Sequence, residues 1–131
     1  MMDMSSYATG LAHIGIPTTE FEDTALFYTE LGFETIYACG SISDHSRVCF
    51  MRLGDLTVEI YEEESCAMCT GGIEHFAINV HDIEEVFGFI NKRGLNNTDD
   101  EIHFLPYFEN GVRYFTIEGP NKEKVEFNQY L

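Results

Sequence analysis

Two histidines and two glutamates occur in pairs whose spacing could build a metal site. His13 and His75 each begin a short apolar, strand-like stretch, and Glu59 and Glu126 each follow a valine in a later apolar segment. Neutral imidazole and carboxylate together suit borderline divalent metals such as Zn, Ni, Co, Fe or Mn. Four such ligands on an octahedral ion would leave two positions for water or substrate, as catalysis requires.

An internal repeat supports this grouping. The offset of 62 that aligns His13 with His75 also aligns Gly32 with Gly94, the two glycines that we expect to end a helix. Glu59 and Glu126 are equivalent at an offset of 67, and the five extra residues fall in loops. Equivalent positions of two paired modules would converge, so we expect two histidines and two glutamates to face one cavity.

Each half carries signals for one helix and for strands around it. Thr19 with Glu22, and Asp82 with Glu85, have the spacing of helix N-terminal caps. After the helices, β-branched and aromatic residues predict three strands per half. These strands are expected at 33–38, 47–53 and 56–61 in the first half and at 101–105, 112–118 and 124–130 in the second.

The predicted fold class is therefore α+β, with two βαβββ modules forming a mixed, curled sheet around a central metal cavity. The first module is expected at about 8–62, the linker at about 63–71 and the second module at about 72–130. One helix on one small sheet buries too little surface to be stable alone. Residues 1–131 are thus expected to form a single domain with a shared core.

Alternation along the last strand of each half predicts where the glutamates point. Side chains of successive strand residues lie on opposite faces of a sheet. The apolar residues on either side of Glu59 and Glu126 would pack under the helix, so each glutamate is expected on the opposite, cavity-facing side.

Composition excludes several classes of function. Seven Lys and Arg face 23 Asp and Glu, for a formal net charge of −16. Nucleic acids and anionic membrane surfaces both require cationic patches, so neither is an expected partner. No apolar run approaches the roughly 20 residues of a membrane span, and residues 1–6 lack the features of a signal peptide. We expect a soluble, cytoplasmic protein that acts on a small molecule.

The remaining candidate residues have plainer interpretations. Cys66 and Cys69 have the spacing of a redox or zinc motif, but no second ligand pair follows, so we expect two reduced cysteines in a loop. His45, His81 and His103 have no equivalent in the other half and are interpreted as structural or surface residues.

With these features together, the chain resembles the vicinal oxygen chelate superfamily, which includes glyoxalase I, bleomycin resistance proteins, methylmalonyl-CoA epimerase and extradiol dioxygenases. The resemblance covers about residues 8–130. It is carried by His13-Ile14-Gly15-Ile16, Phe27-Tyr28, Leu31-Gly32-Phe33, Val58-Glu59, Ile73-Glu74-His75-Phe76-Ala77, Glu118-Gly119-Pro120-Asn121 and Val125-Glu126-Phe127.

The resemblance implies a ligand set and an assembly. His13, Glu59, His75 and Glu126 match the ligands of glyoxalases, which implies one divalent ion, Zn, Ni or Co. Antibiotic-binding members often lack the complete set, so its retention favours a metalloenzyme. A homodimer is expected, and the site could be built within one chain or across two.

The implied activity is that of a glyoxalase-like lyase or isomerase of the lactoylglutathione-lyase type, which abstracts a proton next to a metal-chelated carbonyl. Glu126 is the first candidate for the base, and Glu59 would act from the opposite face. Pro17 and Glu63 replace the arginine and asparagine common in glutathione-using members, so the thiol stays open. One alternative is a methylmalonyl-CoA-epimerase-like enzyme, which the shortage of basic residues disfavours because the phosphates of CoA require Lys or Arg. Another is a non-catalytic antibiotic-binding protein. Iron-dependent ring cleavage is a weaker option.

Overall fold

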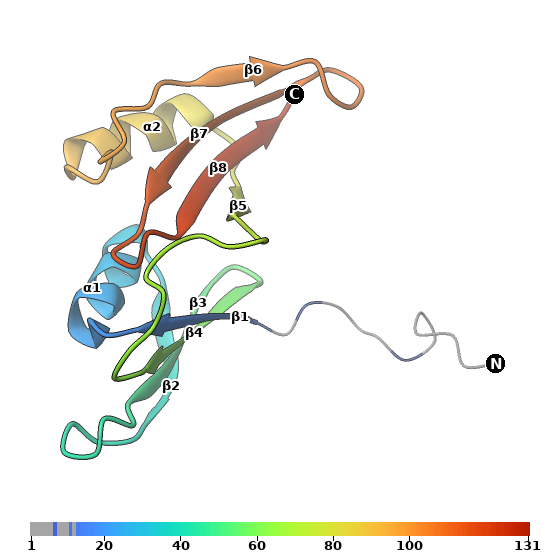
Figure 1. Cartoon of the computed structure of the whole chain (residues 1–131). Coiled ribbons are helices and arrows are strands. Elements are labelled where there is room, and N and C mark those ends of the chain that lie inside the picture. The colour runs from blue at the N-terminus through green and yellow to red at the C-terminus, as the bar shows by residue number, and fades with distance from the viewer. Residues whose placement is uncertain (1–6, 8–10, 12) are drawn as a thin grey trace.

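The computed structural model describes residues 7, 11 and 13–131, in which the order β-α-β-β-β occurs twice (Figure 1). The predicted start of the first module near residue 8 and the segment 1–6 lie outside the described residues. The first module contains β1 (Ile14–Thr18), α1 (Phe21–Leu31), β2 (Glu34–Cys39), β3 (Val48–Leu53) and β4 (Leu56–Glu62). The second contains β5 (His75–Asn79), α2 (Ile83–Lys92), β6 (His103–Leu105), β7 (Val112–Glu118) and β8 (Lys124–Tyr130).

Each module forms its own four-stranded mixed sheet. The strand orders are β1-β4-β3-β2 and β5-β8-β7-β6, so the two sheets have the same topology. In each of them the first strand is parallel to the last, and the other neighbours are antiparallel. The predicted fold class of two βαβββ modules is confirmed, with the mixed sheet divided into two halves.

The two helices begin in different ways. Asp82 caps α2 as predicted, because its side chain accepts a hydrogen bond of 3.1 Å from the Glu85 backbone N–H. The predicted cap at Thr19 is wrong, since α1 begins after Glu20 and has no side-chain cap. Instead the Thr18 hydroxyl accepts from the Glu20 N–H at 2.8 Å, and the Thr24 hydroxyl donates to the Glu20 carbonyl at 2.7 Å.

Strand boundaries follow the expectation closely except at β6. β7 and β8 span the predicted residues, whereas β6 begins at His103 and not at residue 101. Side chains replace the missing strand residues along the edge of β7. Asn97 bonds both the N–H and the carbonyl of Glu118, while Thr98 and Asp100 bond the carbonyl and the N–H of Thr116.

The buried core draws on both modules. Val58 and Ile60 of β4, and Val125 and Phe127 of β8, are all buried in one cluster with residues of both helices. Each helix therefore covers one face of its own sheet, and the opposite face carries the glutamates, as the alternation predicted. Within the described part of the chain, no helix is long and apolar enough to cross a membrane.

A polar joint connects the modules. The turn between β7 and β8 reaches α1 (Figure 1), where the Tyr28 hydroxyl donates to the Glu123 carboxylate at 2.9 Å. The Asn121 side-chain amide donates to the Thr24 hydroxyl at 2.9 Å. Tyr28, Thr24 and Asn121 are all buried. The chain thus fixes the second module against the helix of the first.

Candidate metal centre

His13 and Glu59 form the first half of the candidate site. In the parallel pairing of β1 with β4, Gly15 lies opposite Glu59. His13 is two residues before Gly15 and therefore on the same face. The distance between His13 Nε2 and Glu59 Oε1 is 3.2 Å. The His13 ring also meets the Phe50 ring edge to face, with centroids 5.4 Å apart.

His75 and Glu126 form the second half by the same construction. Ala77 lies opposite Glu126 in the pairing of β5 with β8, so His75 shares its face. The distance between His75 Nε2 and Glu126 Oε1 is 3.7 Å. The repeat thus gives two His–Glu half-sites, each with one nitrogen and one oxygen donor.

The outer contact of His75 fixes which nitrogen faces the glutamate. Its Nδ1 lies 3.2 Å from Glu74 Oε1. A carboxylate accepts, so Nδ1 donates; when the ring is neutral, the Nε2 lone pair then faces Glu126. Two acceptors then face each other, and a cation between them would satisfy both. The donor set of each half-site therefore fits a borderline divalent ion.

Electrostatics at the second half-site are consistent with this chemistry. Burial raises the pKa of the Glu126 carboxyl; the nearby His75 lowers it, and the charge of Glu74 raises it further. A carboxyl with a raised pKa is better matched to accepting and returning a proton near neutral pH.

The four predicted ligands do not meet within one copy. No group of three or more histidine, cysteine, aspartate or glutamate side chains suited to a metal is found in the part of the chain that the structure describes. The structure brings His13 to Glu59 and His75 to Glu126 and leaves the pairs separate.

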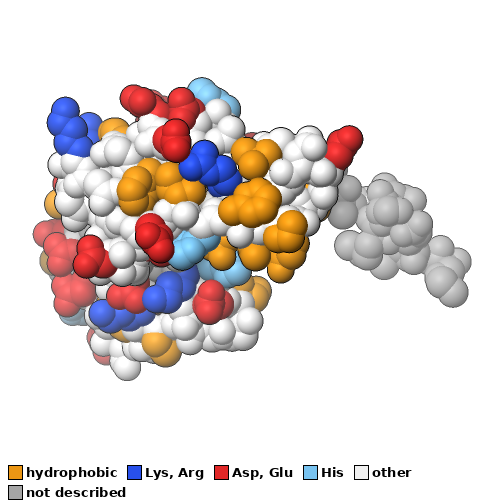
Figure 2. All heavy atoms as spheres, turned by 90° about the horizontal axis from the view of Figure 1, so that it is seen from above, with side chains coloured by type: hydrophobic (Ala, Val, Ile, Leu, Met, Phe, Trp, Pro, Cys, Tyr) orange, Lys and Arg blue, Asp and Glu red, His pale blue; other side chains and the backbone are white. Residues whose placement is uncertain are grey.

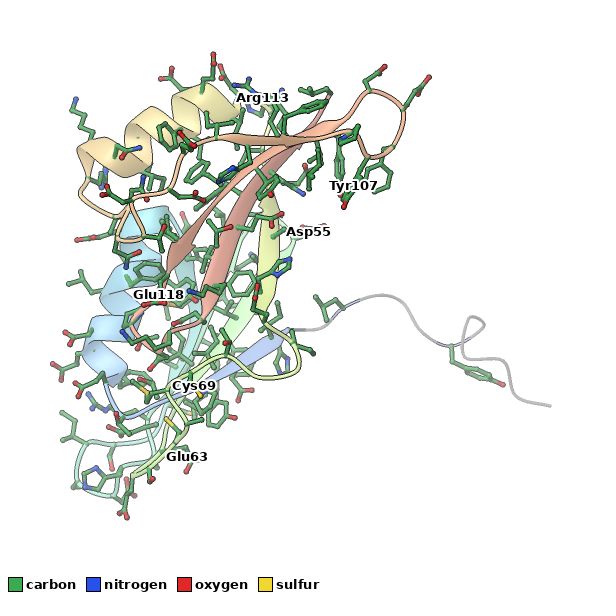
Figure 3. All side chains as sticks on the ribbon, turned by 45° about the horizontal axis from the view of Figure 1, so that its top comes forward. Asp55, Glu63, Cys69, Tyr107, Arg113 and Glu118 are labelled. Carbon is green, nitrogen blue, oxygen red and sulfur yellow. The ribbon has the colours of Figure 1, made fainter. Side chains whose placement is uncertain are left out.

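A cavity of about 600 Å³ lies where the modules meet. β1 and β5 are edge strands of their sheets, and both His13 and His75 line the cavity, as does the connector from β4 to β5. Cys69, labelled on that connector in Figure 3, also lines the cavity. Cys66 and Cys69 are free thiols. Figure 2 shows histidine side chains beside hydrophobic ones near the middle of one face of the molecule.

The two open sheet faces differ in character. Beyond Glu59 the first sheet carries the rings of Phe50 and Tyr37, with centroids 6.2 Å apart. Beyond Glu126 the second sheet carries Thr116 and then Tyr114, whose ring lies against His103. Arg113 points the other way, to Glu84 of α2, and lies beside that helix in Figure 3. The first face is thus aromatic beside its glutamate, and the second adds the polar groups of Thr116 and His103 to the Tyr114 ring.

Sequence reasoning set His103 aside, yet the structure gives it a partner. His103 Nε2 lies 2.6 Å from Asp100 Oδ1. Burial alone would raise the pKa of the Asp100 carboxyl, but the hydrogen bonds from His103 and from the Thr116 N–H hold it below its usual value. No repeat marks this pair, so only the register of β6 could have indicated it.

Two βαβββ modules of this topology form the fold of the solved glyoxalase family and glyoxalase/bleomycin resistance/dioxygenase proteins, so the fold that the resemblance implied is confirmed. No family model matches the chain. The uncharacterized protein YwbC of Bacillus subtilis (strain 168) is 29% identical over 127 residues, which cover 93% of this chain and 98% of YwbC.

Solved structures show the same fold at low sequence identity. The glyoxalase family protein from Enterococcus faecalis is 22% identical, with a TM-score of 0.71 over 92% of this chain and 97% of that one. The fosfomycin resistance protein FosX from Listeria monocytogenes, solved with Mn(II) and a sulfate ion, is 20% identical, with a TM-score of 0.69 over 95% and 94% of the two chains.

Proposed function

We propose that the protein is a metal-dependent enzyme that abstracts a proton next to a metal-chelated carbonyl, with a glyoxalase-like lyase or isomerase reaction as the first candidate. The observation that carries this proposal is the matched pair of half-sites, His13 with Glu59 and His75 with Glu126. The ion would be Zn, Ni or Co. FosX, which shares the fold, was solved with Mn(II).

We propose that two copies of the chain complete the centre. Because one copy keeps its half-sites apart, a four-ligand ion needs His13 and Glu59 of one copy and His75 and Glu126 of a second. A two-fold dimer would hold two such ions. Apolar side chains exposed at the end of the second sheet support a partner there, because large exposed apolar patches mark contact surfaces. They are Phe104, Tyr107, Phe108, Tyr130 and Leu131.

The chain's own residues would divide the chemistry between them. When bound, the ion acts as a Lewis acid that lowers the pKa of the C–H beside the chelated carbonyl. Glu126 accepts that proton and returns it to the neighbouring carbon, while Glu59 serves the opposite face. Glu74 holds the His75 ring so that Nε2 faces the site. The aromatic face around Phe50 excludes water from the reacting carbon.

The reaction is tested with metal-reconstituted protein. Methylglyoxal with several thiols and methylmalonyl-CoA are screened in parallel, and bound metal is measured by elemental analysis. Turnover of a hemithioacetal supports the proposal. Turnover of methylmalonyl-CoA alone favours the epimerase, and ligand binding by metal-free, chelator-insensitive protein favours a sequestering protein.

The shared centre is tested by complementation. One variant carries His13→Ala with Glu59→Ala, the other His75→Ala with Glu126→Ala, and each alone is expected to be inactive. After mixed refolding at equal amounts, half of the dimers are mixed and each has one intact centre of two. We expect about one quarter of the wild-type activity on statistical grounds. No recovery would contradict the shared centre, since a site within one chain stays broken in every copy.

A further inference from the structure

His103 lies on the same face as the proposed metal ligands of its module. Thr116 is opposite Glu126, Tyr114 is two residues from Thr116, and His103 is opposite Tyr114. Cross-strand partners and residues two apart share one face of a sheet. Two strand spacings and two residues separate Glu126 from His103, or about 12 Å between their Cα atoms. His103 therefore stands at the far end of the open face.

Asp100 is fixed so that it must accept from His103. Its Oδ2 accepts the Thr116 N–H at 2.9 Å, and its backbone N–H donates to the Asn96 side chain at 3.1 Å. The remaining oxygen, Oδ1, lies 2.6 Å from His103 Nε2. An ionised carboxylate only accepts, so it selects the ring form with the proton on Nε2.

The second ring nitrogen is consequently an acceptor. In the neutral ring with a proton on Nε2, Nδ1 carries a lone pair. Nδ1 makes no hydrogen bond to any residue in the part of the chain that the structure describes. The side chain is 41% exposed, and its ring leans on Tyr114 with centroids 5.3 Å apart. Its orientation is thus set from two sides while one acceptor stays open to a ligand.

We propose that His103, oriented by Asp100, is a specificity-determining residue whose Nδ1 accepts a hydrogen bond from a donor at the end of the substrate that is distant from the metal. The donor is a hydroxyl, thiol or amide N–H group. This inference rests on the proposed metal centre and deepens it by naming a feature of the substrate. The aromatic face around Phe50 would contact the apolar body between the two polar ends.

The orientation of the ring is tested first, in metal-free protein. Long-range ¹H–¹⁵N correlation of the imidazoles should show the His103 proton on Nε2. In Asp100→Asn the amide oxygen must still accept from the Thr116 N–H, so the amide NH₂ group faces the His103 ring. This group donates to Nε2, which must then be the acceptor, so the ring proton moves to Nδ1. A proton on Nδ1 in the wild type, or no change in the variant, would overturn the proposal.

The ligand is tested with hydroxamates, which chelate metals through two oxygens. Cobalt-loaded protein is titrated by visible absorption with acetohydroxamate and with a series of linear hydroxamates that end in hydroxyl, methoxy or methyl groups. In the wild type, the best hydroxyl tail should bind about three- to tenfold more tightly than its methoxy and methyl counterparts, as expected for one net hydrogen bond.

Variants separate this contact from the metal centre. His103→Phe should erase the preference for the hydroxyl tail and leave acetohydroxamate binding unchanged, and His45→Asn, in an exposed loop of the other module, should change neither. In Asp100→Asn, Nδ1 becomes a donor, so the hydroxyl and methoxy tails should bind equally. An unchanged preference in His103→Phe overturns the assignment of His103 alone. Absence of cobalt or acetohydroxamate binding overturns the proposed metal centre, and this inference with it.

Discussion

Glu126 combines two properties that a proton carrier needs, a half-buried carboxyl with a raised pKa and a place beside a histidine nitrogen. Glu126→Gln keeps the shape of the side chain but removes the base. We expect turnover to fall about 100-fold or more, the usual effect of losing a general base. Steady-state kinetics on the substrate found in the screen measures this fall.

A matched control comes from the same open face. Glu118 is bonded to Lys124 and has no histidine partner among the described residues, so Glu118→Gln should leave turnover within about twofold. Full metal-dependent turnover by Glu126→Gln would refute the role of Glu126.

The contribution of Asp100 to stability should depend on pH in a defined direction. Its carboxyl pKa is lowered in the folded chain, so the ionised form stabilises the fold above the carboxyl's ordinary pKa. That contribution is lost as the pH falls through the lowered value. Urea unfolding of wild type and Asp100→Asn should differ most above about pH 5, begin to converge at about pH 4 and become equal only below the lowered pKa. A difference that grows on acidification would contradict the lowered pKa.

At the scale of the elements, the two helix starts make contrasting predictions. Asp82→Ala removes a side-chain cap and should lower the free energy of unfolding by about 1 kcal/mol. Glu20→Ala should have little effect, because α1 has no side-chain cap there. Chemical unfolding of both variants checks this, and equal losses would show that the two helices begin alike.

The elements were predictable where local patterns decide them. Alternation and turn residues located β7 and β8 to the residue, and Gly32 ends α1 in the left-handed conformation as expected. The start of β6 was not predictable from local patterns. The Thr116 N–H of β7 is bonded by the side chain of Asp100, whereas in a regular strand pair a backbone carbonyl would accept it. The predicted cap of α1 at Thr19 was wrong for a similar reason. The side chains of Thr18 and Thr24 hydrogen-bond to each other and to the backbone of Glu20 at the start of the helix.

The sequence predicted which residues form the candidate site, but not whether one chain or two bring them together. The repeat identified His13, Glu59, His75 and Glu126, and register brings each histidine to its glutamate. Whether one chain or two would unite the pairs depends on how the modules pack. Contacts between distant residues contribute to that packing, such as the hydrogen bond in the polar joint between Tyr28 and Glu123, which lie 95 positions apart in the sequence.

At the scale of the whole molecule, we propose that this joint makes the two modules unfold as one domain. Tyr28→Phe leaves a Glu123 oxygen without its donor and should cost about 1–3 kcal/mol. Histidine proton resonances provide probes in both modules, such as His45 and His103. In urea both should report one midpoint, lowered equally by the variant. Separate midpoints in the wild type would indicate two domains.

The acidity of the chain predicts how its dimer responds to salt. Each copy carries a formal charge of −16, and acidic side chains are scattered over the face that Figure 2 shows. Copies therefore repel each other, and raising the salt concentration from about 0.02 to 0.2 M shortens the range of this repulsion. Sedimentation should show tighter dimers at the higher salt and again after metal is added. A dimer that weakens with salt would indicate contacts dominated by opposite charges.

The side chains along β7 have a consequence for how the protein behaves in a crowded solution. An exposed sheet edge is a template on which strands of other molecules can add. Asn97, Thr98 and Asp100 occupy the hydrogen-bonding groups of Glu118 and Thr116 where β6 falls short, so this stretch offers few free positions to an incoming strand. Their value to the molecule lies in resistance to aggregation, a property that neither turnover nor a melting curve would reveal.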